Sequence, residues 1–334
     1  MREVRLLVTG GCGFIGSNFI RYMLERYENV RIVNVDKLSY GSNVENLRGV
    51  DRSRHEFIKG DMCDRELMRK LIGSVDAVVN FAAETHVDRS IADPYPFLKS
   101  NVEGVVSILE ALRSRKDVRL VHISTDEVYG DVERDSFRES DRLRPSSPYA
   151  ASKASADMFC LAYRRTYGLD VVTVRLTNTF GPYQFPEKLI PKTVIRAILG
   201  LSIPIYGSGK NIRDWLYVLD ACEAIDLALR KGEPGEIYNV SAGNELENIE
   251  VVRRILKVMG RDESLIEFVD NRPGHDVRYS LDSTKIRREL GWRPKYAFDK
   301  ALEATVKWYV ENEWWWRPIA TEKVLHPTPW KLRW

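Results

Sequence analysis

Apolar runs and amphipathic segments alternate along the first half of the chain. Six segments are apolar or β-branched, as is typical of buried strands: residues 4–9, 31–35, 57–60, 77–81, 118–123 and 171–176. Three segments between them have helical spacing of apolar positions: residues 14–26, 64–72 and 102–112. This alternation predicts a parallel sheet covered by helices on both faces, so the expected fold class is α/β, doubly wound.

The alternation of strands and helices loosens after about residue 180. Helical spacing recurs near residues 189–200, 219–230 and 248–259. Four prolines are expected to mark loops in this part: Pro182, Pro186, Pro191 and Pro204. We expect this second part to form a smaller, mixed α/β lobe over the carboxyl edge of the sheet.

The expected domain boundary follows from this change of pattern. Residues 1–180 are assigned to the larger lobe, to which the chain returns later, and residues 181–334 mainly to the smaller lobe and a tail. The tail, residues 314–334, carries five of the eight tryptophans of the chain. Because free tails are rarely so aromatic, we expect it to pack against the body or a partner subunit.

The amino-acid composition and net charge limit the kinds of partner and the cellular location that we expect. The chain has 334 residues, 44% of them hydrophobic, and 51 Lys and Arg against 48 Asp and Glu. A net charge of +3 argues against nucleic acid or an acidic membrane surface as a partner. The four cysteines are scattered, the start lacks a signal-peptide pattern, and no apolar stretch approaches about 20 residues. A cytoplasmic location is therefore expected.

A glycine-rich turn follows the first predicted strand. Gly10, Gly13 and Gly16 lie where a strand gives way to a helix, an arrangement that lets a pyrophosphate approach the backbone and the helix N-terminus. Asp36 ends the second predicted strand, 20 residues after Gly16, where a carboxylate would bind ribose hydroxyls and repel a 2′-phosphate. The pattern predicts a Rossmann-type NAD site, with a purely structural turn as the alternative.

Two further motifs carry reactive groups. Tyr149 and Lys153 are four residues apart on an expected helix, so the phenol and the ammonium share one face. We expect the ammonium and a cationic nicotinamide to favour the phenolate, which would make Tyr149 a base. Thr125, Asp126 and Glu127 follow the fifth strand, and two adjacent carboxylates there indicate acid–base chemistry beyond simple oxidation. A solvated Tyr–Lys pair and a carboxylate that only caps or pairs with Arg are the alternatives.

The glycine spacing resembles that of the extended short-chain dehydrogenase/reductase family. In that family the residues after the third strand flank the adenine, and those at the end of the fourth line the cofactor. The resemblance implies this cofactor-binding set: Gly10, Gly13, Phe14, Ile15, Gly16, Asp36, Lys37, Asp61, Met62, Phe81, Ala82, Ala83, Thr85, Ser100, Tyr149 and Lys153.

The Thr-Asp-Glu-Val-Tyr-Gly segment at 125–130, with Tyr149 and Lys153, is similar to the nucleotide-sugar 4,6-dehydratases, most closely those acting on dTDP-glucose. Segments 83–90, 181–191, 213–218 and 272–279 agree, and the match runs to about Tyr309. The resemblance implies C4 oxidation by Tyr149 and NAD, with Thr125 on the C4 oxygen. Glu127 would then take the C5 proton while Asp126 protonates the leaving C6 hydroxyl.

The same resemblance implies a substrate site in which Lys188, Arg213 and Arg272 hold a diphosphate and Tyr206 contacts the nucleobase. The substrate-binding set that it implies is Thr85, Asn178, Lys188, Leu189, Pro204, Tyr206, Arg213, Asn248, Arg272, His275 and Tyr279. It also implies a homodimer joined through helices near 97–112 and 150–166.

Two departures from the family pattern leave open whether the substrate carries dTDP or UDP. Thr179 and Phe180 stand where Asn and Tyr are usual, and Gln184 stands where His is usual. UDP-glucose 4,6-dehydratase therefore remains an alternative. UDP-sugar 4-epimerases and decarboxylases share the glycine and Tyr–Lys motifs but lack the Asp–Glu pair. A non-catalytic NAD-sensing scaffold is the alternative outside enzymes. The five histidines have no metal-ligand spacing, so no metal is expected.

Overall fold

A computed structural model describes residues 2–334. Its largest element is a seven-stranded sheet with the order β10-β6-β5-β4-β1-β2-β3, in which every neighbouring pair is parallel. Six of its strands come from residues 4–176, and β10 returns from later in the chain. The strands are β1 Val4–Thr9, β2 Val30–Asp36, β3 His55–Lys59, β4 Ala77–Asn80, β5 Arg119–Thr125, β6 Val171–Leu176 and β10 Ile237–Val240.

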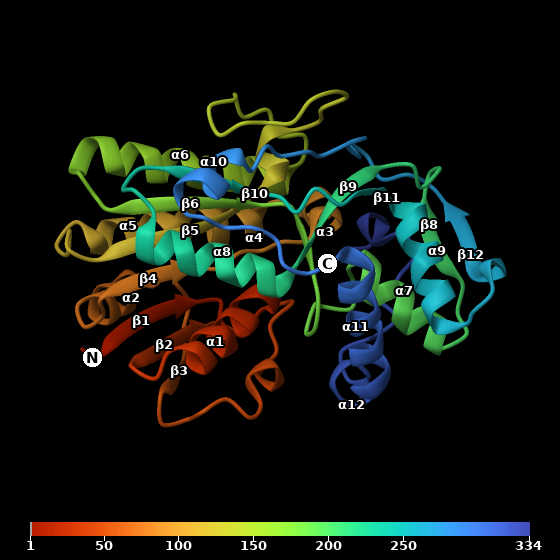
Figure 1. Cartoon of the computed structure of the whole chain (residues 1–334), viewed down its shortest axis with the longest axis horizontal. Helices are drawn as coiled ribbons and strands as arrows, with labels where there is room; N and C mark the ends of the chain where they lie inside the picture. Colours follow the sequence, from red (N-terminus) through yellow and green to blue (C-terminus); the bar gives the residue numbers. More distant parts are fainter. Residues whose placement is uncertain (1) are drawn as a thin grey trace.

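Helices cover both faces of this sheet (Figure 1). On one face α1 packs against α8, and on the other α2, α5 and α6 pack side by side. Alternating side chains of β1 explain the two layers, because Leu6 and Val8 lie in the core under α1 and α8, whereas Leu7 lies in the core under α2 and α5. The helices of this lobe are α1 Phe14–Arg26, α2 Arg65–Ile72, α3 Val87–Ala92, α4 Tyr95–Phe97, α5 Gly104–Leu112, α6 Pro148–Tyr167, α8 Val218–Lys231 and α10 Thr284–Glu289.

The smaller lobe lies beside the carboxyl ends of the large sheet and is built around two small sheets (Figure 1). One has the order β11-β9-β7 and the other pairs β12 with β8 in parallel. Its elements are β7 Asn178–Phe180, α7 Leu189–Ile198, β8 Ile203–Tyr206, β9 Ile212–Tyr217, β11 Glu245–Glu247, α9 Asn248–Met259, β12 Ile266–Val269, α11 Phe298–Glu311 and α12 Glu313–Trp316. The short helical turns are η1 Val44–Leu47, η2 Leu98–Glu103, η3 Asp126–Tyr129, η4 Glu263–Leu265 and η5 Pro329–Lys331.

The doubly wound parallel sheet predicted from the sequence is confirmed, and the predicted strands and helices differ from the observed ones by a few residues at their ends. Two proline predictions are wrong. Pro191 is the third residue of α7, where a missing backbone N–H costs no intrahelical hydrogen bond. Pro204 lies inside β8, which belongs to a two-stranded sheet and so has a free edge.

Candidate active site

The glycine-rich turn joins β1 to α1 at the carboxyl edge of the sheet. Gly10 has a φ of +72°, and a Cβ there would lie 2.5 Å from the backbone nitrogen of Ala82. A Cβ on Gly16 would lie 2.5 Å from the carbonyl oxygen of Gly10. Both positions therefore require glycine, and the first turn of α1 presents backbone N–H groups to the cleft. This cradle fits the diphosphate of a dinucleotide.

Asp36 ends β2 as predicted and is buried. Its carboxylate accepts hydrogen bonds from the backbone N–H of Cys12 (3.0 Å), the N–H of Leu38 (2.8 Å) and the hydroxyl of Ser42 (3.0 Å). A carboxylate has about four acceptor sites, so one remains for a ribose hydroxyl. Asp36 thus fixes the glycine turn and can still bind a ribose.

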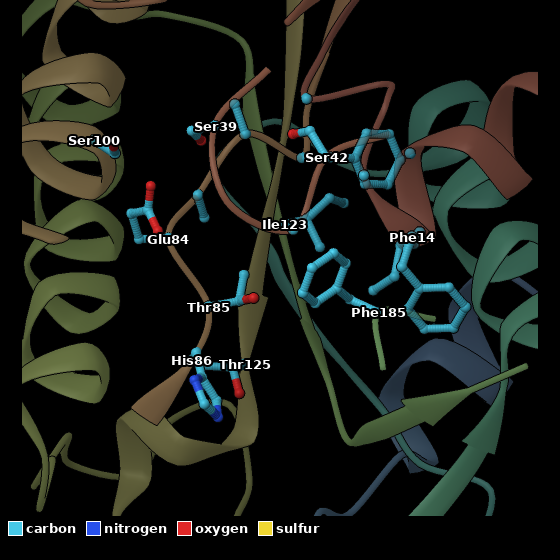
Figure 2. A pocket seen from close by; sticks show the side chains of 18 of the residues that line it. Phe14, Ser39, Ser42, Glu84, Thr85, His86, Ser100, Ile123, Thr125 and Phe185 are labelled. Carbon is cyan, nitrogen blue, oxygen red and sulfur yellow. The ribbon is translucent and has the colours of Figure 1, made fainter. Parts of the chain in front are cut away.

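The predicted cofactor residues surround a single cleft at this edge. Figure 2 shows Phe14 and Phe185 on one side of the cleft and Glu84, Thr85 and His86 on the other. All sixteen residues of the predicted cofactor set line it, together with Thr125, Asp126 and Glu127. The sequence analysis missed the loop after β2, which adds Ser39, Tyr40 and Ser42 to the wall. Loop serines carry no periodic signal that would single them out.

The acidic pair lies where β5 passes into the turn η3. The Thr125 hydroxyl donates to Asp126 Oδ1 (3.0 Å) and accepts from the backbone N–H of Glu127 (3.3 Å). Among residues 2–334, the buried Oδ2 of Asp126 has no hydrogen-bond partner. A buried polar atom without a partner is costly, so its presence in the cleft wall indicates a site for a ligand group.

The environments of the two carboxyls differ. Burial raises the pKa of Asp126 to about 8, and the neighbouring charge of Glu127 acts in the same direction. Burial also raises the pKa of Glu127, but Arg272, Arg213 and Lys188 oppose this by favouring the carboxylate. A pKa near 8 keeps Asp126 mostly protonated at neutral pH, whereas the three cations near Glu127 favour its carboxylate form, so the pair suits an acid beside a base.

Tyr149 and Lys153 face the same cleft from the first turns of α6, which begins at Pro148 behind the capping hydroxyl of Ser147. Lys153 Nζ donates to the carbonyl oxygen of Ile123 (2.7 Å), and burial lowers its pKa to about 8. Burial and the charge of Glu127 raise the pKa of Tyr149, opposed by a hydrogen bond with Thr125.

A second pocket adjoins the first and shares His86, Glu127, Asn178, Glu187 and Lys188 with it. Apart from Val87 and Asp88 of α3, the rest of its wall comes from the smaller lobe. Apart from Thr85, which lines the first cleft, the predicted substrate residues all line this pocket. They are Asn178, Lys188, Leu189, Pro204, Tyr206, Arg213, Asn248, Arg272, His275 and Tyr279.

The cations of this pocket are held in fixed positions. Arg213 is buried, donates to the carbonyl oxygens of Ile212 (2.7 Å) and Asp276 (2.9 Å), and lies 4.1 Å from the centre of the Tyr279 ring. Arg272 donates to Asp88 Oδ1 (3.0 Å), and its Nε has no partner among the described residues. Fixed guanidinium groups with free donors suit phosphate oxygens.

Asp88 links the two lobes. It lies in α3 of the larger lobe, is buried, and also accepts a hydrogen bond from the Tyr206 hydroxyl (3.0 Å) at the end of β8. Burial alone would raise the pKa of Asp88, but the charges of Arg272, His86 and Lys192 and the hydrogen bond from Arg272 together lower it. The sequence analysis did not single out Asp88, although it lies within the quoted 83–90 segment. Asp88 orients Arg272 and Tyr206, which are far from it in the sequence, so its role can be recognised only from the structure.

The two departures from the family pattern contact each other. Gln184 Nε2 donates to the carbonyl oxygen of Thr179 (2.9 Å), and both residues line the first cleft. Phe180 is buried against Trp215 and Tyr217. The altered residues therefore form one local arrangement beside Asn178, a predicted sugar-binding residue.

Within residues 2–334, no group of three or more His, Cys, Asp or Glu side chains is placed to hold a metal ion. No helix in this part of the chain has the length and apolar character needed to span a bilayer.

Comparison with known proteins identifies the family. The family model for GDP-mannose 4,6-dehydratase matches residues 7–305. The dTDP-glucose 4,6-dehydratase of Streptomyces niveus is 47% identical over 95% of this chain and 96% of its own length. The low-salt glycan biosynthesis protein Agl12 of Haloferax volcanii is also 47% identical, over 92% of this chain and 99% of its own.

Solved structures agree. The dTDP-glucose 4,6-dehydratase DesIV of Streptomyces venezuelae, solved with NAD bound, superposes with a TM-score of 0.93. It is 48% identical and covers 95% of this chain and all of its own. A UDP-glucose 4-epimerase of Thermotoga maritima gives a TM-score of 0.86 at 28% identity, covering 93% of this chain and all of its own. The family resemblance inferred from the motifs is confirmed, and the chain belongs to the GDP-mannose 4,6-dehydratase family of nucleotide-sugar-modifying proteins.

Proposed function

We propose that the protein is a nucleotide-sugar 4,6-dehydratase that converts dTDP-glucose to dTDP-4-keto-6-deoxy-glucose with a tightly bound NAD. The observation that carries the proposal is the Asp126–Glu127 pair, which lies in the same cleft wall as Tyr149 and where the two pockets meet. A cofactor in the first cleft and a nucleotide in the second would bring the sugar onto these three residues. Relatives 44–48% identical to this chain are named dTDP-glucose 4,6-dehydratases.

Tyr149 begins the reaction by removing the proton of the C4 hydroxyl. The Thr125 hydroxyl holds the C4 oxygen, and the Lys153 ammonium lies one helical turn from Tyr149 in the same cleft. NAD, when bound along the glycine turn and Asp36, would take the C4 hydride and, after water is lost, return it to C6 while a proton returns to C5. Because burial raises the pKa of Tyr149 in the protein alone, the phenol stays protonated until a cationic ring lies beside it.

The acidic pair then removes water. A ketone at C4 acidifies the C5 hydrogen, which the ionised Glu127 takes, while the protonated Asp126 gives its proton to the departing C6 hydroxyl. A pKa near 8 keeps Asp126 an acid at neutral pH, and the nearby Arg272, Arg213 and Lys188 favour the carboxylate of Glu127, which supports these roles.

The smaller lobe supplies the nucleotide site. Lys188, Arg213 and Arg272 provide positive charges for the diphosphate, and Tyr206 with His275 provides rings for the base. The buried oxygens of Asn178 and Asn248, which lack partners within residues 2–334, would accept from sugar or nucleoside hydroxyls. Removing cations of this kind typically costs about 2–5 kcal/mol of binding when the partner charge is buried.

Two other enzyme functions compete. A UDP-sugar 4-epimerase has the fold, as the Thermotoga structure illustrates, but needs no adjacent acid and base after Thr125. UDP-glucose 4,6-dehydratase would use the same pair, and the Gln184–Thr179 contact keeps that substrate open. A non-catalytic NAD-sensing scaffold has no need for Asp126, Glu127, Tyr149 and Lys153 together.

The test is to incubate the purified protein with dTDP-glucose and, separately, with UDP-glucose, and to analyse products by mass spectrometry. A product lighter by one water, with a higher kcat/KM for dTDP-glucose, supports the proposal. The matched variants Asp126→Asn and Glu127→Gln should oxidise C4 but lose water far more slowly than the wild-type protein. An unchanged mass with both substrates would overturn the proposal, and a mass-neutral isomer would indicate an epimerase.

We also propose that the chain is divided into a cofactor lobe and a substrate lobe and that it forms a homodimer, as the family resemblance implies. Residues 1–180, with later returns of the chain, form the cofactor lobe, and residues 181–334 mainly form the substrate lobe. A homodimer through helices near 97–112 and 150–166 is supported by the exposed Leu98, Met158 and Phe159. Four unpaired cysteines support a reducing, cytoplasmic setting. Light scattering of the protein and of Phe159→Lys tests the dimer, which the variant should dissociate.

A further inference from the structure

The last part of the C-terminal tail, residues 317–334, returns to the middle of the molecule. It lies beyond the 7–305 segment matched by the family model, and it contains Trp330 and Trp334. In Figure 1 the C-terminus lies beside α3, and η5 of the tail packs against α3. The prediction that this aromatic segment packs against the body is confirmed, and its position next to the second pocket calls for an explanation.

Contacts with both lobes hold the tail in place. Arg196 of α7 donates to the carbonyl oxygen of Leu325 (2.7 Å), and Lys331 pairs with Asp270 (2.5 Å) after β12. At the other end the Trp334 ring lies 5.3 Å from the Tyr40 ring and 5.1 Å from the Arg89 guanidinium. These contacts join α7 and β12 of the smaller lobe to the cofactor cleft wall.

The tail also touches two residues that line the nucleotide pocket. The Trp330 ring meets the Tyr206 ring edge to face, with centroids 4.7 Å apart and planes at 79°. Since the Tyr206 hydroxyl donates to Asp88 (3.0 Å), this ring is held at its hydroxyl end and against one tryptophan. Edge-to-face pairs of this kind contribute about 0.5–1.5 kcal/mol beyond area burial.

The second pocket residue is Lys192, which lies one helical turn after Leu189 on α7. Its Nζ donates to the carbonyl oxygen of His326 (3.2 Å), which leaves two of three N–H groups for a ligand. Burial lowers the pKa of Lys192 to about 8, and the charges of Asp88 and Glu187 oppose this, so the amine is mostly charged at neutral pH. A buried ammonium beside Tyr206 suits the carbonyl oxygens of a nucleobase.

We propose that the tail residues 321–334 form part of the nucleobase subsite, in which Trp330 positions Tyr206 and the His326 carbonyl positions Lys192 to bind a base carbonyl. The proposal rests on the proposed nucleotide-sugar function and deepens it. Trp330 is a positioning residue, because it acts through Tyr206, whereas Lys192 contacts the base. The tail does not contact Asp126, Glu127 or Tyr149, so it governs nucleotide binding and leaves the chemical steps alone.

The experiment compares Trp330→Ala, Trp330→Phe and Lys192→Met with a matched control, Trp314→Ala, which removes an exposed tryptophan of α12. Calorimetry measures the Kd of dTDP, UDP and GDP for each NAD-loaded protein, and kinetics give KM and kcat for dTDP-glucose. Trp330→Ala and Lys192→Met should weaken dTDP binding and raise KM about tenfold, with kcat within twofold of wild type. Trp330→Phe should restore most of the affinity, and Trp314→Ala should change nothing.

Other outcomes separate the two proposals. If wild-type protein turns over dTDP-glucose and Trp330→Ala keeps its Kd and KM, the tail assignment is wrong. A loss of kcat without a change in KM, or equal losses in Trp330→Phe and Trp330→Ala, would also overturn it. If wild-type protein binds dTDP but turns over neither dTDP-glucose nor UDP-glucose, the proposed function fails, while the binding data still decide the role of the tail.

Discussion

Water elimination should depend on the protonation of Asp126, and the structure gives the pH at which it fails. Burial and the charge of Glu127 raise the pKa of this carboxyl to about 8. At pH 7 about ten molecules in eleven then carry the proton, and at pH 9 about one in eleven. The rate of water loss should therefore fall about tenfold between pH 7 and pH 9.

Lys153 also has a pKa lowered to about 8, so a steady-state pH profile would mix two groups. The assay must follow the two steps separately in single turnovers. Absorbance of the reduced cofactor reports C4 oxidation, and mass spectrometry of quenched samples reports water loss. Lys153 assists Tyr149 in C4 oxidation and takes no part in water loss. Its titration should therefore appear in the absorbance of the reduced cofactor, and the titration of Asp126 in the rate of water loss.

The matched variant is Asp126→Asn, which keeps the shape and removes the acidic proton. It should oxidise C4 at near the wild-type rate, lose water about 10²–10⁴-fold more slowly, and accumulate the 4-keto sugar that still carries its C6 hydroxyl. Its residual elimination should show no fall near pH 8. The reasoning is refuted if the variant eliminates water at the wild-type rate, or if wild-type elimination is flat from pH 7 to pH 9.

Three further predictions follow from the same geometry. Asp126→Asn should raise the melting temperature, and by more at pH 9 than at pH 5. The folded protein keeps a proton on Asp126 that the unfolded chain releases above about pH 4, so the loss of stability caused by this carboxyl grows with pH and is greatest above pH 8. An equal rise in melting temperature at both pH values would contradict this. Gly16→Ala should lose bound NAD, because its Cβ would lie 2.5 Å from the Gly10 carbonyl oxygen, whereas Gly73→Ala, whose Cβ would lie 3.3 Å from the nearest backbone oxygens, should retain it when cofactor content is measured. Tyr149→Phe should slow C4 oxidation about 10²–10⁴-fold at an unchanged melting temperature, and normal cofactor reduction in stopped flow would refute its role as base.

Local patterns in the sequence were enough to predict the large sheet. The alternation of Leu6, Leu7 and Val8 reflects burial on both faces, and the glycines at 10 and 16 reflect backbone contacts that exclude any Cβ. Such signals depend on neighbours a few residues apart, or on a motif that the chemistry repeats. The acidic pair belongs to this class, because two adjacent carboxylates at a strand end are visible without coordinates.

The smaller lobe could be predicted only in part. Its strands are three or four residues long in most cases and pair with distant segments, as Asn178 pairs with Trp215, so no local period marks them. Lys192 sits in a largely apolar helix, and its place in the pocket depends on which face of α7 the lobe buries. The contact between Trp330 and Tyr206 joins residues 124 positions apart and leaves no trace in either sequence segment.

The central claim is that one cleft oxidises C4, removes water and reduces C6 of the same sugar. The most direct measurement uses dTDP-glucose with deuterium at C4 and locates the label in the product by NMR and mass spectrometry. The account predicts a product that is lighter by one ordinary water and carries the deuterium at C6. Label that is lost to solvent, or that remains at C4, would contradict it.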